Sequence, residues 1–417
     1  MKAGPRSRPP WPGTTMMTCV SALACAALLV ALILAAHRLI DAIACAVSRR
    51  RLRAKVAAWT PPAVSWIARQ QNVVVIVNPN AGAGWGDCVY EDVVRPMLRR
   101  AGLEHEVVRT TCAGMAEREA AELAARKVPV DCVLSVSGDG QLHECLNGLR
   151  GGGTGGRTAL AVVPAGTGNG MSDTCFGRGS DAFEALCSIL CASGPTPVDV
   201  MRLTYPDEPV RTPRHDLHFF CWAVFADHDY VTENGWRWLG PLLKLALAPL
   251  YVIAQRRGYA GTVEFEPAGA LEPPDSEWKR EAYPYSDAAA LPPSPHDATL
   301  RVLEGPFWCL AVGNCPEGGS ATLPVPRARM ADGGRADLLV CRHTPRLTRW
   351  RCLQLFLMME KGEHVAQPDV AVYKTRRLRL YPRGGTGHLQ LSGQEMPMPR
   401  GGVVQLDVLP DDQLLVF

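Results

Sequence analysis

The sequence predicts an α/β nucleotide-binding type of domain with a parallel sheet, followed by a β-rich, antiparallel, sandwich-like domain, both behind one N-terminal transmembrane helix. Three observations support this architecture: an uncharged N-terminal segment, short aliphatic runs that alternate with helical patterns from Val73, and a change to alternating strands after about Arg202. We expect an anchor and basic linker over 1–70, the α/β domain over 71–201, and the β-rich domain over 202–417.

The N-terminal segment TTMMTCVSALACAALLVALILAAH carries no charge from Thr14 to Ala36, which is long enough to cross a hydrocarbon core of about 30 Å. The basic run RRRLRAK begins at Arg49, and more basic residues follow the segment than precede it. This asymmetry predicts a single-pass membrane anchor with the rest of the chain in the cytosol. The alternative is a cleaved signal peptide or organelle presequence, although the apolar stretch exceeds the roughly 7–15 residues usual for a signal peptide.

The overall composition is that of an ordinary globular protein, and its near-balanced charges exclude a strong electrostatic field over the whole molecule. The 417 residues include 44 basic and 41 acidic side chains, a net charge of +3, so nothing favours nucleic acid as a partner. Fifteen cysteines are spaced irregularly without a CxxC pair, which indicates reduced thiols rather than a disulfide framework.

The α/β domain is predicted from three strand-and-helix repeats. VVVIV from Val73 precedes a helical pattern over Val89 to Ala101, VDCVLSV precedes one over Gln141 to Arg150, and ALAVV precedes a stretch through Ala192. The later segments TVEFE, RLRLY, HLQLS and VVQLDVL alternate as antiparallel strands do. Between them, residues 267–295 are proline-rich without apolar periodicity, which is typical of a surface insertion.

Each aliphatic run ends in a glycine loop. The first loop is NPNAGAGWG from Asn78, which fits neither a Walker A loop nor a dinucleotide fingerprint and alone equally fits a flexible turn. The second is SGDG from Ser137, and the third is PAGTGN, with Gly166, Thr167, Gly168 and Asn169. Because the carboxyl ends of parallel strands meet at one edge of the sheet, the three loops together predict a ligand site there.

Asp139 stands between two glycines at the start of the second predicted helix, whose Leu142, Cys145, Leu146 and Leu149 are spaced to form one apolar face. Glycine lets a backbone approach a phosphate, and a helix N-terminus adds positive potential, whereas an unpaired aspartate would repel the phosphate. The acid is therefore expected to take up a proton as a general base, or to face a cation as an indirect magnesium ligand. The structural alternative is a helix N-cap or Asx-turn aspartate.

In order and spacing, NPNAGAG, SGDGQLHECLNGL and PAGTGN resemble the catalytic domain of the diacylglycerol kinase and sphingosine kinase superfamily, and the resemblance is greatest to sphingosine kinase. It extends from about Val73 to Phe417. The resemblance implies transfer of the γ-phosphate of ATP, with Mg²⁺, to the primary hydroxyl of a sphingoid base, with Asp139 as the base. It also implies nucleotide contacts from the matching positions, which are Asn78, Pro79, Asn80, Gly82, Gly84, Thr110, Gly138, Gly140, Glu144, Gly166, Thr167, Gly168 and Asn169, and substrate contacts from Ser137, Gly138 and Gly140.

In the second domain, FFCWAVFADHDY is expected to be an apolar strand that ends with Asp227 and Asp229 on one face. By resemblance, Asp229 is similar to the aspartate that receives the substrate amine, and Asp227 is assigned to the same substrate site. That charge favours a sphingoid base over ceramide or diacylglycerol. The alternatives are two acids facing a loop or, less well supported, a metal site that includes His228.

Two basic residues, Arg237 and Lys244, match the region where the family contacts ATP phosphates, with Lys244 displaced by one position. An arginine between two tryptophans also suits a stacked surface residue. The segment RLTRWRCLQLFLMMEKG is expected to be a helix that packs on the second domain, or one that touches a membrane.

The chain departs from the family near its C-terminus, where the usual Asp-Gly-Glu reads Ser392-Gly393-Gln394-Glu395. Either two acids have become neutral, or the register slips by one and Glu395 takes the place of the glutamate. Gly393, Gln394 and Glu395 remain candidate nucleotide contacts, with no dedicated protein metal site expected. The leading hypothesis is a sphingoid-base kinase, the alternative within this chemistry is a diacylglycerol or ceramide kinase, and the alternative of another class is a pseudokinase that binds lipid or nucleotide without transfer.

Overall fold

The computed structural model describes residues 35–417 apart from 37–38, 41, 64, 83, 154–156, 232–246, 248–249, 252–253, 255–256, 270–284, 320–321, 386 and 401. The chain divides into two compact units, 1–54 and 55–417. Within the described part, no helix combines the length and the apolar character needed to cross a bilayer. The predicted span from Thr14 lies almost entirely outside the described residues, so the anchor stays a prediction.

The α/β part of the second unit contains the predicted parallel sheet. Its strands run in the order β4-β3-β1-β2, all parallel. Their bounds are β1 (Val73–Val77), β2 (Glu106–Arg109), β3 (Cys132–Ser137) and β4 (Ala159–Pro164). The aliphatic runs form β1, β3 and β4 because both faces of these strands are buried. The edge strand β2 was not anticipated, since its four residues are only half-buried and carry charges at both ends.

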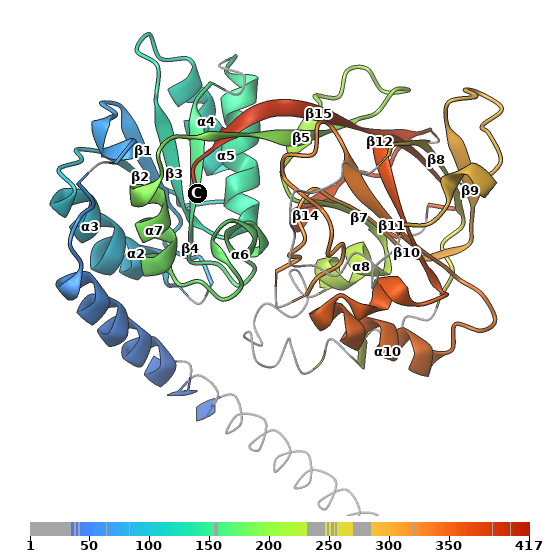
Figure 1. Cartoon of the computed structure of the whole chain (residues 1–417), viewed down its shortest axis with the longest axis horizontal. Coiled ribbons are helices and arrows are strands. Elements are labelled where there is room, and N and C mark those ends of the chain that lie inside the picture. The colour runs from blue at the N-terminus through green and yellow to red at the C-terminus, as the bar shows by residue number, and fades with distance from the viewer. Residues whose placement is uncertain are drawn as a thin grey trace, which may run out of the picture. The chain divides into compact units, whose positions relative to one another are not determined.

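Helices cover this sheet as the sequence predicts (Figure 1). The described elements are η1 (Ile67–Arg69), α2 (Gly86–Val89), the π-helix η2 (Tyr90–Val94), α3 (Arg95–Arg100), α4 (Met115–Ala124), α5 (Asp139–Gly151), α6 (Gly170–Phe176) and α7 (Ala182–Cys191). The expected apolar face of α5 is buried against the sheet through Leu142, Cys145, Leu146 and Leu149. His143 and Asn147 of α5 are buried as well, which points to a polar contact described below.

The rest of the unit is antiparallel, as predicted, and TVEFE, RLRLY, HLQLS and VVQLDVL all lie in its strands. Those strands are β5 (Thr196–Thr204), β6 (Arg214–Asp216), β7 (Phe219–Ala223), β8 (Gly261–Pro267), β9 (Arg301–Glu304), β10 (Phe307–Gly313), β11 (Ala336–Arg342), β12 (Val370–Pro382), β13 (Leu389–Leu391), β14 (Gln394–Met396) and β15 (Val404–Leu415). The helical elements are α8 (Val224–Tyr230), α10 (Arg349–Met358), η6 (Ala288–Ala290), η7 (Met359–Lys361) and η8 (Glu363–Ala366).

Two long strands connect the two parts. β15 pairs with β12 and β5 and then, at Leu415, runs parallel to β4, so the C-terminal strand returns to the α/β sheet (Figure 1). The boundary drawn from the sequence at 201/202 falls inside β5, which continues without interruption from Thr196 to Thr204. The thirteen described cysteines are free thiols, in agreement with the sequence prediction.

The described end of the proline-rich insertion is anchored rather than loose. Tyr285 packs on the β-rich core and donates a hydrogen bond to Asp337 at 3.1 Å. Asp337 in turn lies 2.5 Å from the buried ammonium of Lys374, which also contacts Asp332. The segment 270–284 of the insertion lies outside the described residues.

Candidate functional site

The three glycine loops meet backbone to backbone at the carboxyl ends of β1, β3 and β4. A Cβ atom on Gly82 would lie 2.8 Å from the Ala165 carbonyl oxygen. A Cβ on Gly138 would lie 2.6 Å from the Gly168 oxygen, and one on Gly166 would lie 2.6 Å from the Cα of Gly138. Only glycine permits such contacts, because any side chain would force the loops apart. The glycines therefore serve at least to hold the three loops together at one sheet edge.

The first loop is closed by its own asparagine. Asn78 Oδ1 accepts a hydrogen bond from the Asn80 amide at 3.0 Å, and Asn78 Nδ2 lies 3.4 Å from Ser137 Oγ of the second loop. Pro79 fills the turn between the two asparagines. Gly86, at the start of α2, passes so close that a Cβ would lie 1.8 Å from the Asn78 carbonyl oxygen.

Two further predicted nucleotide contacts, Thr110 and Asn169, lie at the same edge. Thr110 directly follows β2 and donates its amide to the Val77 carbonyl at 2.9 Å, so it sits beside the first loop. Asn169 closes the third loop: its side chain accepts from the Gly166 amide at 3.1 Å and donates to the Gly166 carbonyl at 3.0 Å. Arg237 and Lys244 lie outside the described residues, and their phosphate contacts stay predictions.

Asp139 is the first residue of α5, and its carboxylate connects α5 to α6. Oδ2 accepts from the Gly170 amide at 2.8 Å and Oδ1 from the Met171 amide at 3.0 Å, both at the N-terminus of α6. The residue is 9% exposed, and Gly138 rather than Asp139 is the N-cap of α5. Asp139 thus caps a helix, as the structural alternative expected, but the helix is its neighbour α6 and not its own α5. Each oxygen keeps a lone pair, so a substrate hydroxyl remains a possible donor to it.

The altered Ser392-Gly393 pair forms the two-residue turn between β13 and β14. Both residues have positive φ, 45° and 77°, as this kind of hairpin turn requires. The turn directs Gln394 at α5, where its Nε2 lies 3.2 Å from the Gly140 carbonyl and 3.4 Å from Glu144 Oε1. Glu395 points to the other face of the hairpin, 3.8 Å from His388. Of the two registers considered, Gln394 and not Glu395 therefore faces the loops.

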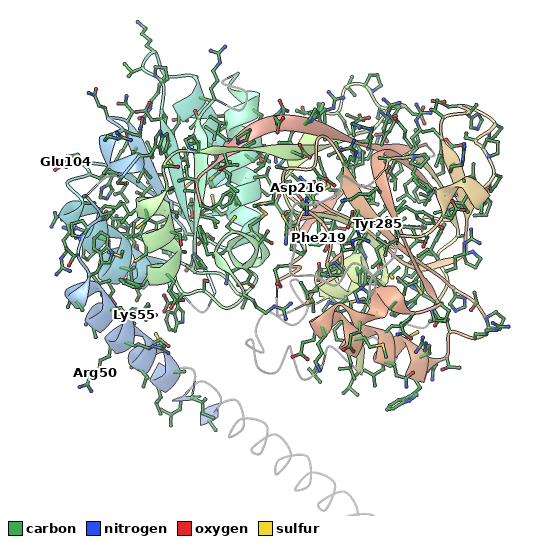
Figure 2. All side chains as sticks on the ribbon, in the orientation of Figure 1. Arg50, Lys55, Glu104, Asp216, Phe219 and Tyr285 are labelled. Atoms are coloured by element: carbon green, nitrogen blue, oxygen red, sulfur yellow. The ribbon has the colours of Figure 1, made fainter. Side chains whose placement is uncertain are left out.

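Sequence reasoning missed a buried polar network beneath this turn. Asp216, which is labelled in Figure 2, is 2% exposed. It accepts hydrogen bonds from Ser392 Oγ at 2.7 Å and from the Phe219 amide at 3.1 Å. It also lies 3.2 Å from His143 Nδ1. Asn147 donates to the His143 carbonyl at 2.8 Å. The spacing of His143 and Asn147, four residues apart on a helix, was the available signal. The network ties the hairpin to α5 and so fixes where Gln394 stands.

The prediction that Asp227 and Asp229 share one face of a strand is wrong. β7 ends at Ala223, whose φ is 68°, and the next seven residues form α8. Residues two apart on a helix point about 200° apart, so the two acids face different surroundings. Asp227 is 2% exposed, whereas the Asp229 side chain is 44% exposed and lies 3.3 Å from His228. The continuous apolar run of the segment suggested a strand throughout, but the chain turns into α8 after Ala223, where α8 packs on β7 and β10.

Asp227 is fully engaged by protein donors. Oδ1 accepts from the amide and Nδ1 of His388, at 2.9 and 2.8 Å, and Oδ2 accepts from the Tyr259 hydroxyl at 2.5 Å and from Arg257. Burial raises the pKa of the Asp227 carboxyl, but the hydrogen bonds from Tyr259, His388 and Arg257 outweigh it and leave the pKa below its usual range. Asp227 is therefore a structural carboxylate, and only Asp229 of this pair is accessible to a substrate.

Comparisons with known proteins point to the same part of the chain as the loop geometry. Residues 72–203, which include all three loops, match the family model of the diacylglycerol kinase catalytic domain. This part of the chain, residues 72–203, is therefore similar to that catalytic domain. Sphingosine kinase 1 of Arabidopsis thaliana is 28% identical over 336 residues, covering 76% of this chain and 65% of that protein. Sphingosine kinase 1 of Homo sapiens is 26% identical over 350 residues, covering 79% of this chain and 87% of that protein.

Among solved structures, a putative diacylglycerol kinase from Bacillus anthracis str. Sterne shares the fold of this chain. Its TM-score is 0.57 at 20% identity, over 84% of this chain and 98% of that chain. The chain spans just under two thirds of the length of the Arabidopsis relative. Within the described residues, no group of three or more histidine, cysteine, aspartate or glutamate side chains is arranged to hold a metal ion.

Proposed function

We propose that this protein is an ATP-dependent lipid kinase of the diacylglycerol kinase superfamily that transfers the γ-phosphate of ATP to the primary hydroxyl of a sphingoid base. The observation that carries the proposal is the meeting of three glycine loops around the N-terminus of α5, where Asp139 is the acidic residue. Exposed backbone at strand ends suits phosphate binding, and an acid there suits a hydroxyl that must lose its proton. The similarity to sphingosine kinases supports the choice of lipid.

In the proposed reaction, a lone pair of the Asp139 carboxylate takes the proton of the lipid hydroxyl. The hydroxyl oxygen forms a bond to the γ-phosphorus while the bond from that phosphorus to the bridging oxygen breaks, and ADP leaves. The two amides of α6 hold Asp139 in a fixed position. This geometry also keeps the carboxylate partly neutralised, so that it does not repel the phosphates.

The residues at the loops fit magnesium that arrives with ATP better than a resident metal. Mg²⁺ is commonly held by one or two carboxylates together with substrate phosphates and waters, and it supplies positive charge against the phosphates. Glu144 is the carboxylate that would hold it, since among the described residues its donors are the Gly114 amide at 3.0 Å and, more weakly, Gln394 at 3.4 Å. Gln394 replaces an acid of the family with a neutral donor, which leaves one carboxylate rather than two beside the nucleotide.

Asp229 is proposed to receive the amine of the lipid, because it is the accessible acid on α8. A diacylglycerol or ceramide kinase is the alternative within this chemistry, and neither of those lipids carries an amine that Asp229 could bind. A pseudokinase is the alternative of another class, and the neutral Ser392 and Gln394 are the observation in its favour. We also propose that the uncharged segment from Thr14 anchors the chain in a membrane with residues 55–417 in the cytosol.

The test offers the full chain labelled ATP, Mg²⁺ and a panel of sphingosine, dihydrosphingosine, ceramide and diacylglycerol in mixed micelles. Label should appear on the two sphingoid bases alone and disappear with Asp139→Asn. Because Asp139 also caps α6, ATP binding by calorimetry and the thermal stability of this variant must be measured beside its activity. Label on diacylglycerol or ceramide would select the alternative kinase, and ATP binding without label on any lipid would select the pseudokinase.

A further inference from the structure

Gln390, the middle residue of β13, has a buried amide oxygen without a hydrogen-bond donor. The residue is 2% exposed, and no donor in the described part of the chain reaches its Oε1 atom. Its neighbours Leu389 and Leu391 are apolar and fully buried. An unsatisfied buried acceptor costs about 1–3 kcal/mol, so an apolar residue would stabilise this strand better than glutamine does. The buried amide oxygen of Gln390 is therefore a candidate acceptor for a donor that a ligand brings.

The surroundings of Gln390 are those of the proposed lipid site. β13 places Gln390 opposite Cys221 of β7 and opposite Glu395 of β14, so the three side chains share one face of the sheet. Burial raises the pKa of the Cys221 thiol well above its usual value, and the negative charges of Asp229 and Asp216 raise it further. His388, two residues before Gln390, stacks on Tyr230 of α8 with 3.9 Å between the ring centroids, so this part of the sheet packs against the helix that carries Asp229.

The chemistry of a sphingoid base leaves one donor for Gln390. Its head group carries a primary hydroxyl, an amine and a secondary hydroxyl. Under the proposed function, on which this inference rests, Asp139 meets the primary hydroxyl and Asp229 meets the amine. A neutral amide oxygen suits a neutral hydroxyl, whereas the charged amine gains more from a carboxylate.

We propose that Gln390 is a specificity residue for the lipid head group, and that its Oε1 atom accepts a hydrogen bond from the secondary hydroxyl of the sphingoid base. A lipid with an ester or hydrogen at that carbon leaves Oε1 unsatisfied. The discrimination therefore comes from the penalty of an unpaired buried acceptor, which is the usual origin of selectivity for a hydroxyl.

The test compares dihydrosphingosine with its 3-deoxy analogue in mixed micelles, using the full chain and the variant Gln390→Met, which keeps the length of the side chain. We expect the unaltered chain to prefer dihydrosphingosine by about tenfold in kcat/KM, and Gln390→Met to lose this preference by losing activity on dihydrosphingosine alone. An equal loss on both lipids, or an unchanged preference, would overturn the proposal.

A second readout separates this role from a structural one. Because Gln390 Oε1 is unsatisfied in the protein alone, Gln390→Met should be at least as stable to urea as the unaltered chain. The matched control is Gln405→Met on β15, where the amide donates to Asp407 and accepts from Arg379. That control should lose stability and keep the lipid preference. A marked loss of stability in Gln390→Met would contradict the proposal.

Equilibrium binding of the same two lipids, without ATP, separates the failure of this inference from the failure of the proposed kinase activity. If no phosphate is transferred but dihydrosphingosine binds more tightly in a way that depends on Gln390, the inference stands and the kinase activity fails. If both lipids bind and are phosphorylated equally well, the inference fails and the kinase activity stands.

Discussion

The two acids of α8 allow a sharp test, because the same substitution should lower stability at Asp227 and lower activity at Asp229. Asp227→Asn should destabilise the fold, since the buried carboxylate accepts from His388, Tyr259 and Arg257. Asp229→Asn should leave stability within about 0.5 kcal/mol, because the side chain is 44% exposed. We expect Asp229→Asn instead to lower kcat/KM for an amine-bearing lipid.

The magnitude for Asp227→Asn follows from its contacts. An asparagine keeps one acceptor oxygen and turns an NH₂ group toward the donors on the other side, so about two hydrogen bonds to a charged acceptor are lost. Each contributes about 1.5–3 kcal/mol, a total of about 3–6 kcal/mol. The Arg257 side chain is 51% exposed and can turn to water, which reduces the expected loss to about 3 kcal/mol.

The assay is urea unfolding of the full chain, followed by intrinsic fluorescence, with both variants and the unaltered protein at several pH values. Because the folded pKa of Asp227 is depressed, its contribution is present above the unfolded value near 4 and is lost as pH falls below it. The difference between unaltered protein and Asp227→Asn should therefore shrink in acid. Equal stability of the two variants at neutral pH would refute the assignment of Asp227 as a structural carboxylate.

Three further predictions follow from single contacts. Gly138→Ala should weaken ATP binding and lower stability, because the new Cβ would lie 2.6 Å from a backbone oxygen. The control Gly140→Ala, with open space around its Cβ, should be at least as stable as the unaltered chain. A Gly138→Ala variant of unchanged stability would contradict the packing of the loops. Gln394→Glu should lower the free energy of unfolding by about 1 kcal/mol, because the new carboxylate would repel Glu144. Added Mg²⁺ should restore the lost stability in a urea titration. If Mg²⁺ has no effect, a cation does not bind between Glu144 and the new glutamate. Burial lowers the pKa of His364 to about 4. His364 should therefore lower the free energy of unfolding by about 1.4 kcal/mol per pH unit as pH falls from about 6.5 toward 4. His364→Gln should flatten the stability profile in this range, and an unchanged slope would refute the prediction.

Much of the fold and the loop site was readable because the signals are local. Apolar runs of five or six residues form buried parallel strands, and a glycine loop after each run must lie at the carboxyl edge. The helical face of α5 followed in the same way from the spacing of Leu142, Cys145, Leu146 and Leu149. These features depend on residues that are neighbours along the chain, so one sequence suffices to place them.

What only the tertiary structure decided concerns residues far apart in sequence. Asp139 caps α6, which begins 31 residues further along the chain, and Asp216 joins His143 to Ser392. The helix α8, which separates Asp227 from Asp229, depends on packing that overrides the strand preference of a continuous apolar run. The register of Gln394 depends on the positive φ of two turn residues and on the partner that the turn faces. In each case a contact between residues far apart in sequence decides the outcome, and the local sequence does not specify the partner in that contact.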